Sequence, residues 1–362
     1  MQRVINYGSY LQAYALKQLL LRHGAKSVEF IDIKEGLHTK EYTIKGLPHY
    51  LRRLRAFIVL LLNRRVIHKI KTRNFMKEVS STIRNAWPDL GLSNIPSYPN
   101  VDLAVIGSDE VFHCCQQTWW GFTTQLYGDI PNASEIVSYA GSFGGTTLEN
   151  LKKLGWDKQI SDNLKKLKFI SVRDDNSKHI VEMLTGIKSR LDIDPVLAYG
   201  FKNEINNVNP VDEKDYILLY SYPDRINDTN EIKAIRNFAK KRNKKLISIM
   251  SCYDWCDRGV VCTPLDVLAW FRNADMVITE TFHGSIFSII TERQFATFGR
   301  KSAMPKLTSM LSPYGLESRL VKDFKIENVF ADEIDYECVN SKLSELRKCS
   351  ENYIAEILSD NN

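Results

Sequence analysis

The clearest candidate for chemistry in this sequence is His283, which follows closely on a short apolar run. Asp275 to Thr279 is predicted to be a buried strand, because its centre is apolar and rich in β-branched residues. After a tight connection through His283, Gly284 and Ser285 open a second apolar run with the spacing of a helix. Ligands of parallel α/β sheets bind at the carboxyl ends of strands, and the free N–H groups of a following helix favour an anion. We therefore predict an anion site at Gly284 and Ser285 with His283 beside it; a packed or capping histidine is the alternative.

A second strand end carries acidic side chains. The run from Val101 to Ile106 is predicted to be a buried strand. The small residues Gly107 and Ser108 follow it, and they would let a ligand approach the backbone. Asp109 and Glu110 come next, and either carboxylate can accept hydrogen bonds from sugar hydroxyls or act as a general base. Structural acids at a strand end are the alternative interpretation.

Arg173 stands at the end of a third predicted strand, Phe169 to Val172. A guanidinium in this position is well suited to hold a carboxylate or a phosphate through two hydrogen bonds. The neighbouring acids Asp174 and Asp175 have a simpler explanation, because either can cap the helix predicted from Ser177 to Leu184.

These positions are spread over two successive α/β units, which predicts the fold class. A chain of 362 residues exceeds one comfortable core, so we expect an N-terminal domain of residues 1–198 and a C-terminal domain of residues 199–362. Polar groups at strand ends in both units indicate a site in the cleft between the domains. Further strands are predicted at Val28–Ile33, Ile136–Ala140, Tyr216–Tyr220, Lys245–Met250 and Gln294–Phe298, and further helices at Tyr10–Leu21, Glu231–Arg242, Leu265–Asn273, Met304–Leu311 and Val339–Leu358.

Composition narrows the class of protein. The chain is 44% hydrophobic and 25% charged, which is typical of a globular protein, and its net charge of +6 mildly favours anionic ligands. Nothing in the sequence supports a nucleic-acid partner. The longest apolar run, Ala56 to Leu62, is too short to span a bilayer, and the first residues lack the apolar stretch of a secretory signal. We therefore expect a cytoplasmic protein.

A long basic segment has two interpretations. No acidic residue occurs from Tyr42 to Lys77, whereas ten lysines and arginines do. A solvated helical hairpin with an apolar seam would explain the pattern. Alternatively, residues 52–73 form basic amphipathic helices that touch anionic lipid at the inner face of the membrane, or a phosphate-bearing acceptor.

Five motifs together resemble those of the polysaccharide pyruvyl transferase family. They occur in the order and approximate spacing of that family from Asn6 to about Arg319, and they are NYGSYLQAYAL, DLAVIGSDEVF, SVRD, DPVL and MVITETFHGSIFSII. The resemblance implies two Rossmann-like domains that face each other across a cleft, the GT-B-like arrangement. It also implies transfer of a pyruvyl group from phosphoenolpyruvate to two hydroxyls of a sugar, which forms a ketal and releases phosphate.

The resemblance assigns roles to residues of this chain. Arg173 and His283 match the arginine and the histidine that the family associates with the donor. We expect the N-terminal domain to be the acceptor side and the C-terminal domain to be the donor side. Asp109 or Glu110 would take the proton of the attacking hydroxyl. No metal or other cofactor is expected, and the acceptor would be a sugar or a lipid-linked oligosaccharide. We place donor binding on Arg173, His283, Gly284, Ser285 and Glu280, and acceptor binding on Asn6, Gly8, Gly107, Ser108 and Ser142.

The sequence leaves two other functions open. A glycosyltransferase that uses a nucleotide sugar could share the architecture, because fold alone does not fix the reaction. A non-catalytic family member is the other alternative, since only five residues precede Asn6 and the usual first strand is expected to be shortened or absent.

Overall fold

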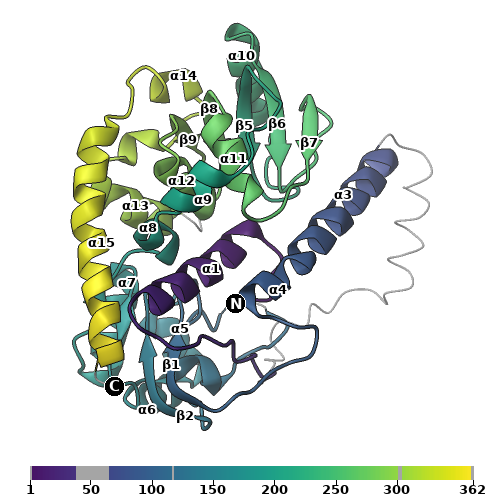
Figure 1. Ribbon diagram of the computed structural model, residues 1–362. Helices are drawn as coiled ribbons and strands as arrows, with labels where there is room; N and C mark the ends of the chain where they lie inside the picture. The colour runs from purple at the N-terminus through teal and green to yellow at the C-terminus, as the bar shows by residue number, and fades with distance from the viewer. Residues whose placement is uncertain (1, 38–64, 116–117, 301–303, 360–362) are drawn as a thin grey trace.

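The computed structural model describes residues 2–37, 65–115, 118–300 and 304–359, and it consists of two α/β halves (Figure 1). In the N-terminal half, β1 pairs with β2 and β3 pairs with β4, all in parallel. Bridges between Val137 and Phe169 and between Gly141 and Val172 join β2 to β3, so the order is β1-β2-β3-β4. The strands are β1 (Val101–Ile106), β2 (Ala133–Ser138), β3 (Ser171–Val172) and β4 (Arg190–Leu191).

The C-terminal half is built on a parallel sheet with the order β7-β6-β5-β8-β9. Numbered along this half, the order is 3-2-1-4-5, which is the order of a Rossmann unit. The fold is therefore α/β with two Rossmann-like halves in a GT-B-like arrangement, as predicted. The strands are β5 (Tyr216–Tyr220), β6 (Lys245–Ile249), β7 (Arg258–Val260), β8 (Met276–Thr279) and β9 (Phe295–Thr297).

Helices cover both sheets. In the N-terminal half they are α1 (Tyr7–Arg22), α3 (Arg65–Asn85), α4 (Trp87–Leu90), α5 (Leu148–Leu154), α6 (Asp157–Leu164) and α7 (Asp175–Thr185). The connection between the halves contains α8 (Pro195–Tyr199) and α9 (Lys202–Asn207). The C-terminal half contains α10 (Thr229–Lys241), α11 (Asp266–Asn273), α12 (Phe282–Ile290), α13 (Met304–Leu311), α14 (Ile326–Val329) and α15 (Tyr336–Ser359).

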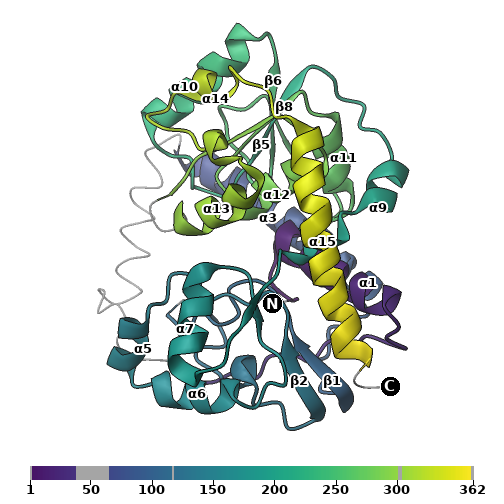
Figure 2. The same ribbon diagram turned by 90° about the vertical axis from the view of Figure 1, so that its left-hand side faces the viewer.

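Two helices tie the halves together. The start of α1 packs in the core of the C-terminal half, where the Tyr7 hydroxyl donates a hydrogen bond to the carbonyl of Cys262. The long helix α15 begins on the C-terminal half and ends on the N-terminal half, as Figure 2 shows. There Tyr353 donates to the carbonyl of Ser138 at the end of β2 and stacks beside Tyr139. The C-terminal helix thus contacts both halves.

One predicted strand does not form. Residues 28–33 run beside the N-terminal sheet without strand hydrogen bonds, so the prediction of a strand from Val28 to Ile33 is wrong. The side chains fit a strand, but a strand needs a hydrogen-bonded neighbour. In this part of the described chain no strand lies between residues 28–33 and β1.

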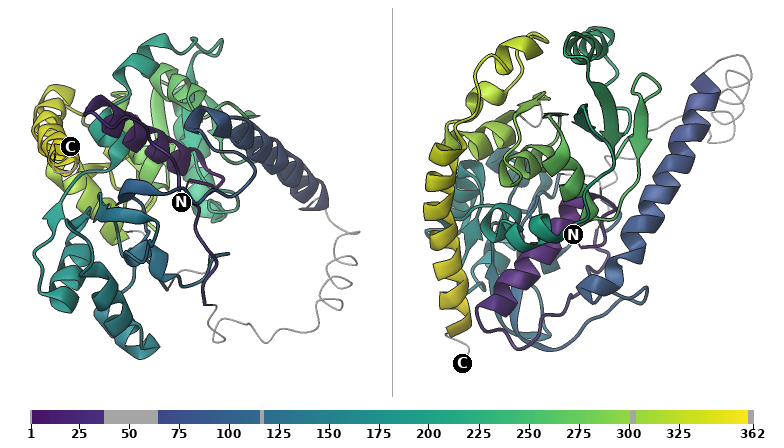
Figure 3. Two further views of the ribbon diagram at one scale, coloured as in Figure 1. Left: turned by 60° about the horizontal axis from the view of Figure 1, so that its bottom comes forward. Right: turned by 45° about the horizontal axis from the view of Figure 1, so that its top comes forward.

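The basic segment is only partly described. Residues 52–64 lie outside the described residues, and residues 65–73 form the first turns of α3, which extends away from the body in Figure 3. Lys71 of this helix pairs with Asp254 at 3.2 Å, and Ile70 is exposed. No helix among the described residues has the length and apolarity that crossing a membrane requires.

Candidate functional site

His283 lies in the first turn of α12, directly after β8, as the sequence predicts. Thr281 is the N-cap, and its hydroxyl accepts the N–H of Gly284 at 2.9 Å. The imidazole is buried against α1, where Gly8 provides the space: a Cβ at Gly8 would lie 2.3 Å from Nδ1 of His283. Its Nε2 is buried without a hydrogen-bond partner and lies 3.9 Å from Asp194. Burial lowers the pKa of His283 to about 4, so the ring is neutral at pH 7 in the ligand-free site.

Arg173 reaches the same place from the carboxyl end of β3. Its side chain is only 3% exposed and lies 3.5 Å from Asp109 and 3.4 Å from Asp194. The guanidinium also lies over the ring of Phe282, 4.7 Å from the centroid. Its Nε and Nη2 have no hydrogen-bond partner. A buried guanidinium with unused donors is able to bind a carboxylate or a phosphate.

Asp109 has an unusual backbone and a strongly acidic side chain. Its φ of 91° lies in a region that non-glycine residues rarely adopt, which is a feature of functional sites. Burial alone would raise the pKa of Asp109, but Lys306, Arg173 and His283 outweigh it and lower that pKa to about 2. The carboxylate is therefore ionised at every pH at which the protein would work.

Lys306 belongs to the site although the sequence reasoning missed it. It comes from α13 in the C-terminal half, and its Nζ lies 3.1 Å from Glu110 and 4.0 Å from Asp109 in the N-terminal half. It also lies 4.5 Å from the centroid of the Phe282 ring, which Arg173 contacts as well. Two cations from different halves thus meet at one aromatic ring. No motif marks Lys306 in the sequence.

Asp194 is a second residue that the sequence reasoning did not place in the site. Asp194 is the N-cap of α8 and is almost fully buried. Its second oxygen accepts a hydrogen bond from Gln12 of α1 and lies near both Arg173 and His283. The sequence feature that could have identified Asp194 as a site residue is its position in the DPVL motif.

The helix start differs in detail from the prediction. The N–H of Gly284 is already bound to Thr281, and that of Ser285 donates to the carbonyl of Thr281. The N–H groups of Phe282 and His283 have no partner among the described residues. Any anion at this end of α12 would therefore meet these two donors.

The other predicted residues have structural contacts. Ser108 lies within 3.4 Å of Arg173 and of Gln12, so it does line the site. The remaining four support the surrounding loops. Glu280 accepts from the N–H of Tyr222, Ser142 donates to Asp174, Asn6 caps α1 by accepting from the N–H of Ser9, and Gly107 lies against Leu16.

The sequence matches the family described as polysaccharide pyruvyl transferase over residues 6–302, which is most of the chain. The chain belongs to the polysaccharide pyruvyl transferase family. This match covers every residue of the site except Lys306, which follows it by four positions. No protein of curated function matches significantly. Members of this family are transferases of polysaccharide metabolism, so a sugar or polysaccharide acceptor is implied.

Several solved structures are distantly similar to this pyruvyl transferase family member. The UDP-GlcNAc 2-epimerase of Neisseria meningitidis is 9% identical, with a TM-score of 0.44 over 98% of this chain and 97% of that one. An α,α-trehalose-phosphate synthase of Burkholderia vietnamiensis is 8% identical, with a TM-score of 0.38 over 65% and 66%. An O-GlcNAc transferase of Thermobaculum terrenum is 12% identical, with a TM-score of 0.34 over 63% of this chain and 48% of that one. Scores this low carry no argument about substrates.

Proposed function

We propose that the protein transfers a pyruvyl group from phosphoenolpyruvate to two hydroxyls of a sugar in a cell-surface polysaccharide or its precursor. The observation that carries this proposal is the buried Arg173, whose Nε and Nη2 have no hydrogen-bond partner among the described residues. It lies near His283, whose Nε2 also lacks a hydrogen bond. Buried polar groups normally have partners, so these three atoms favour a ligand with acceptor atoms on more than one side. Phosphoenolpyruvate has a carboxylate and a phosphate on one three-carbon skeleton.

The donor fits between the two cations. Arg173 would hold one of its anionic groups through the two unused nitrogens, and Lys306 would hold the other. The free N–H groups of Phe282 and His283 add donors at the positive end of α12. Because Arg173 and Lys306 come from different halves, binding of the donor would also fix the two halves relative to each other.

The reaction requires four events. A proton is added to C3 of the enol, which makes C2 electrophilic, and a sugar hydroxyl then attacks C2 and loses its proton. Phosphate leaves with a proton, and the second hydroxyl attacks C2 and loses its proton to close the ketal. The two protons lost by the hydroxyls balance the proton gained by C3 and the proton that leaves with phosphate. We place the phosphate beside His283, whose lowered pKa makes the ring neutral at pH 7 without the donor. A phosphate dianion beside the ring would favour the protonated form, so the donor itself would prepare His283 to protonate the leaving phosphate.

Glu110 is a better candidate for the base than Asp109. A carboxylate whose pKa is about 2, as for Asp109, accepts a proton poorly near neutral pH. The role that suits Asp109 is to balance the charge of Arg173 and Lys306. Glu110 contacts Lys306 alone among the basic side chains of the site, and its side chain is 23% exposed, so an acceptor can reach it.

Release of inorganic phosphate from phosphoenolpyruvate in the presence of bacterial polysaccharide fragments tests the proposal. Phosphate release that depends on the acceptor and is lost in Arg173→Ala and His283→Ala supports it. Arg242→Ala is the matched control, because Arg242 pairs with Glu327 of α14 and not with a residue of the site. Release of a nucleoside diphosphate from a sugar nucleotide would instead support a glycosyltransferase. Binding of a glycan with no turnover of either donor would support a non-catalytic member.

We also propose that the acceptor is presented at a membrane surface, because exposed basic and apolar residues lie together on α3. Lys71 and Arg73 are exposed beside Ile70. Sedimentation with phosphatidylserine vesicles should be strong at low salt and weak at 0.5 M salt, as expected for attraction to anionic lipid. Equal sedimentation with neutral vesicles, or none with either kind, would contradict this part of the proposal.

A further inference from the structure

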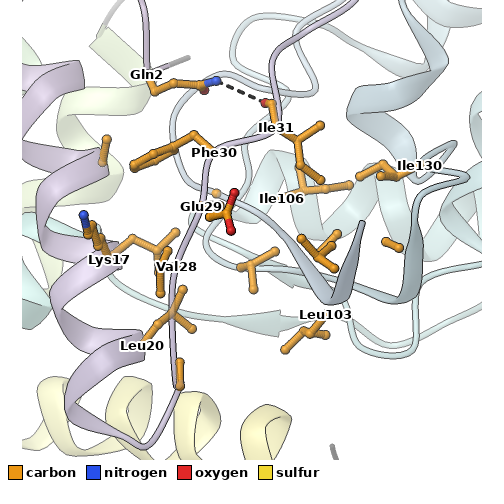
Figure 4. A pocket seen from close by; sticks show the side chains of 18 of the residues that line it. Gln2, Lys17, Leu20, Val28, Glu29, Phe30, Ile31, Leu103, Ile106 and Ile130 are labelled. Carbon is orange, nitrogen blue, oxygen red and sulfur yellow. Dashed lines mark hydrogen bonds between the residues drawn. The ribbon is translucent and has the colours of Figure 1, made fainter. Parts of the chain in front are cut away.

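A cavity in the N-terminal half forms a groove that is separate from the centre of the site. It has a volume of about 690 Å³, and residues 28–31 and β1 line it from two sides, together with residues of α1 (Figure 4). Apolar side chains line it, among them Leu20, Phe30, Leu103 and Ile106. The Gln2 side chain donates to the carbonyl of Ile31 at one end of the groove.

Both walls of the groove are extended backbone that lacks a neighbour. β1 pairs with β2 along one edge, and its other edge faces the groove. In a parallel strand, alternate residues direct their N–H and C=O groups to opposite edges, so the free edge of β1 presents donors and acceptors to the groove. On the opposite wall, the backbone groups of residues 28–30 have no hydrogen-bond partner among the described residues. This wall is the segment whose side chains fit a strand.

The apolar pattern of β1 also indicates a missing neighbour. Val101 to Ile106 is apolar at every position but one, as in strands that have neighbours on both edges and helices on both faces. Even so, Leu103 and Val105 are only partly buried. Edge strands of this kind are usually protected by charge, by proline or by a covering element.

We propose that this groove accepts an extended, apolar strand of a separate polypeptide, which pairs in parallel with β1 and with residues 28–31. Only a polypeptide satisfies both walls, because an acyl chain or a glycan offers no row of alternating N–H and C=O groups. The added strand carries aliphatic side chains on both faces. One face packs on Ala13 and Leu16 of α1, and the other packs toward Val111 and Ile130.

The added strand would affect the site as well as the sheet. Gln12 and Ser108 line the groove and also contact Asp194 and Arg173 of the site. Gly107 connects β1 to this cluster, so a strand paired with β1 would restrict the motion of the loop that carries Ser108 and Asp109. The groove is thus a place where a second polypeptide could order the site.

The test is a synthetic peptide with six central valines and isoleucines between terminal lysines, added to the intact protein. In a second arm, the same sequence is fused ahead of residue 1 through a glycine-serine linker. The fusion raises the effective concentration of the strand, so that pairing is seen even if the free peptide binds weakly. We expect a rise in the melting temperature and at least tenfold slower amide hydrogen exchange in residues 28–31 and 101–106. A counterpart with two central prolines keeps the apolar character but cannot pair, so it should have neither effect.

A groove-filling variant completes the test. Ala13→Phe places a ring in the groove, and Ala13→Ser leaves the groove open as its control. The peptide should protect the serine variant as it does the wild type and leave the phenylalanine variant unchanged. Equal effects of the peptide and its proline counterpart would overturn the proposal, and so would the absence of protection with both the free and the fused strand.

Discussion

The contact between Gly8 and His283 allows a quantitative prediction. An added Cβ at Gly8 would lie 2.3 Å from Nδ1, 2.4 Å from Cγ and 2.9 Å from Cβ of His283. In a helix, Gly→Ala normally stabilises by about 1 kcal/mol. Overpacking a tight core costs about 1–3 kcal/mol. We therefore expect Gly8→Ala to be neutral or to lower the free energy of unfolding by up to about 2 kcal/mol, and to displace the imidazole.

A double-mutant cycle separates the two effects. With alanine at position 283 the contacts at 2.3 and 2.4 Å vanish and only the 2.9 Å contact with Cβ remains. Gly8→Ala should then cost at least about 1 kcal/mol less in the His283→Ala background than in the wild type, a coupling typical of contacting residues. Gly145→Ala is the control, because an added Cβ at Gly145 would meet no atom within 4 Å.

Urea unfolding followed by tryptophan fluorescence measures these free energies, since the chain has six tryptophans. If phosphoenolpyruvate is the donor, it should raise the melting temperature of the wild type. The Gly8→Ala protein should lose this rise, whereas the Gly145→Ala protein should keep it. Additive effects of Gly8→Ala and His283→Ala within about 0.5 kcal/mol would refute the assigned contact.

Three further predictions follow from the site. Because burial lowers the pKa of His283 to about 4, the unfolded chain takes up a proton between about pH 6.5 and 4 that the folded chain does not take up. The free energy of unfolding should therefore fall by about 1.4 kcal/mol per pH unit as the pH falls through this range. If urea titrations of His283→Asn showed the same slope as the wild type, they would contradict this assignment. Arg173→Lys should weaken phosphoenolpyruvate binding at least tenfold in melting-temperature titrations, since one ammonium cannot replace two guanidinium nitrogens, and unchanged affinity would argue against donor binding there. Glu110→Gln should slow acceptor-dependent phosphate release by about a hundredfold while phosphoenolpyruvate still binds, and a proportional loss of binding would show that Glu110 is not the base.

The elements whose signal lies within one short stretch were predictable from the sequence. β1, β5 and α13 have the predicted bounds, and α12 follows β8 as the apolar pattern indicates. Asp174 caps α7 through the N–H of Ser177, which was one of two predicted possibilities. In each case the hydrophobic period or the capping residue was local, so no knowledge of the rest of the chain was needed.

Features that depend on distant residues were not predictable. The segment 28–33 has the residues of a strand but lacks the neighbour that would make it one, and no local pattern reports that. Lys306 enters the site because α13 faces the N-terminal half, so its role depends on the packing of the two halves. The burial of Asp194 and of His283 likewise follows from the position of α1 between the halves, which a strand-by-strand analysis does not reveal.

The charges of the site explain how donor binding and acceptor activation could be coupled in the proposed reaction. Arg173 and Lys306 face the carboxylates of Asp109, Glu110 and Asp194, which balance their charge. An anionic donor that binds Lys306 would therefore compete with a carboxylate. Asp194 is 1% exposed and is held by its helix-capping bond, and Asp109 is held by a hydrogen bond from the N–H of its neighbour. Glu110 is the most exposed of the three and would move most readily. The donor that takes Lys306 from Glu110 would thus also release Glu110 to accept the proton of the sugar hydroxyl.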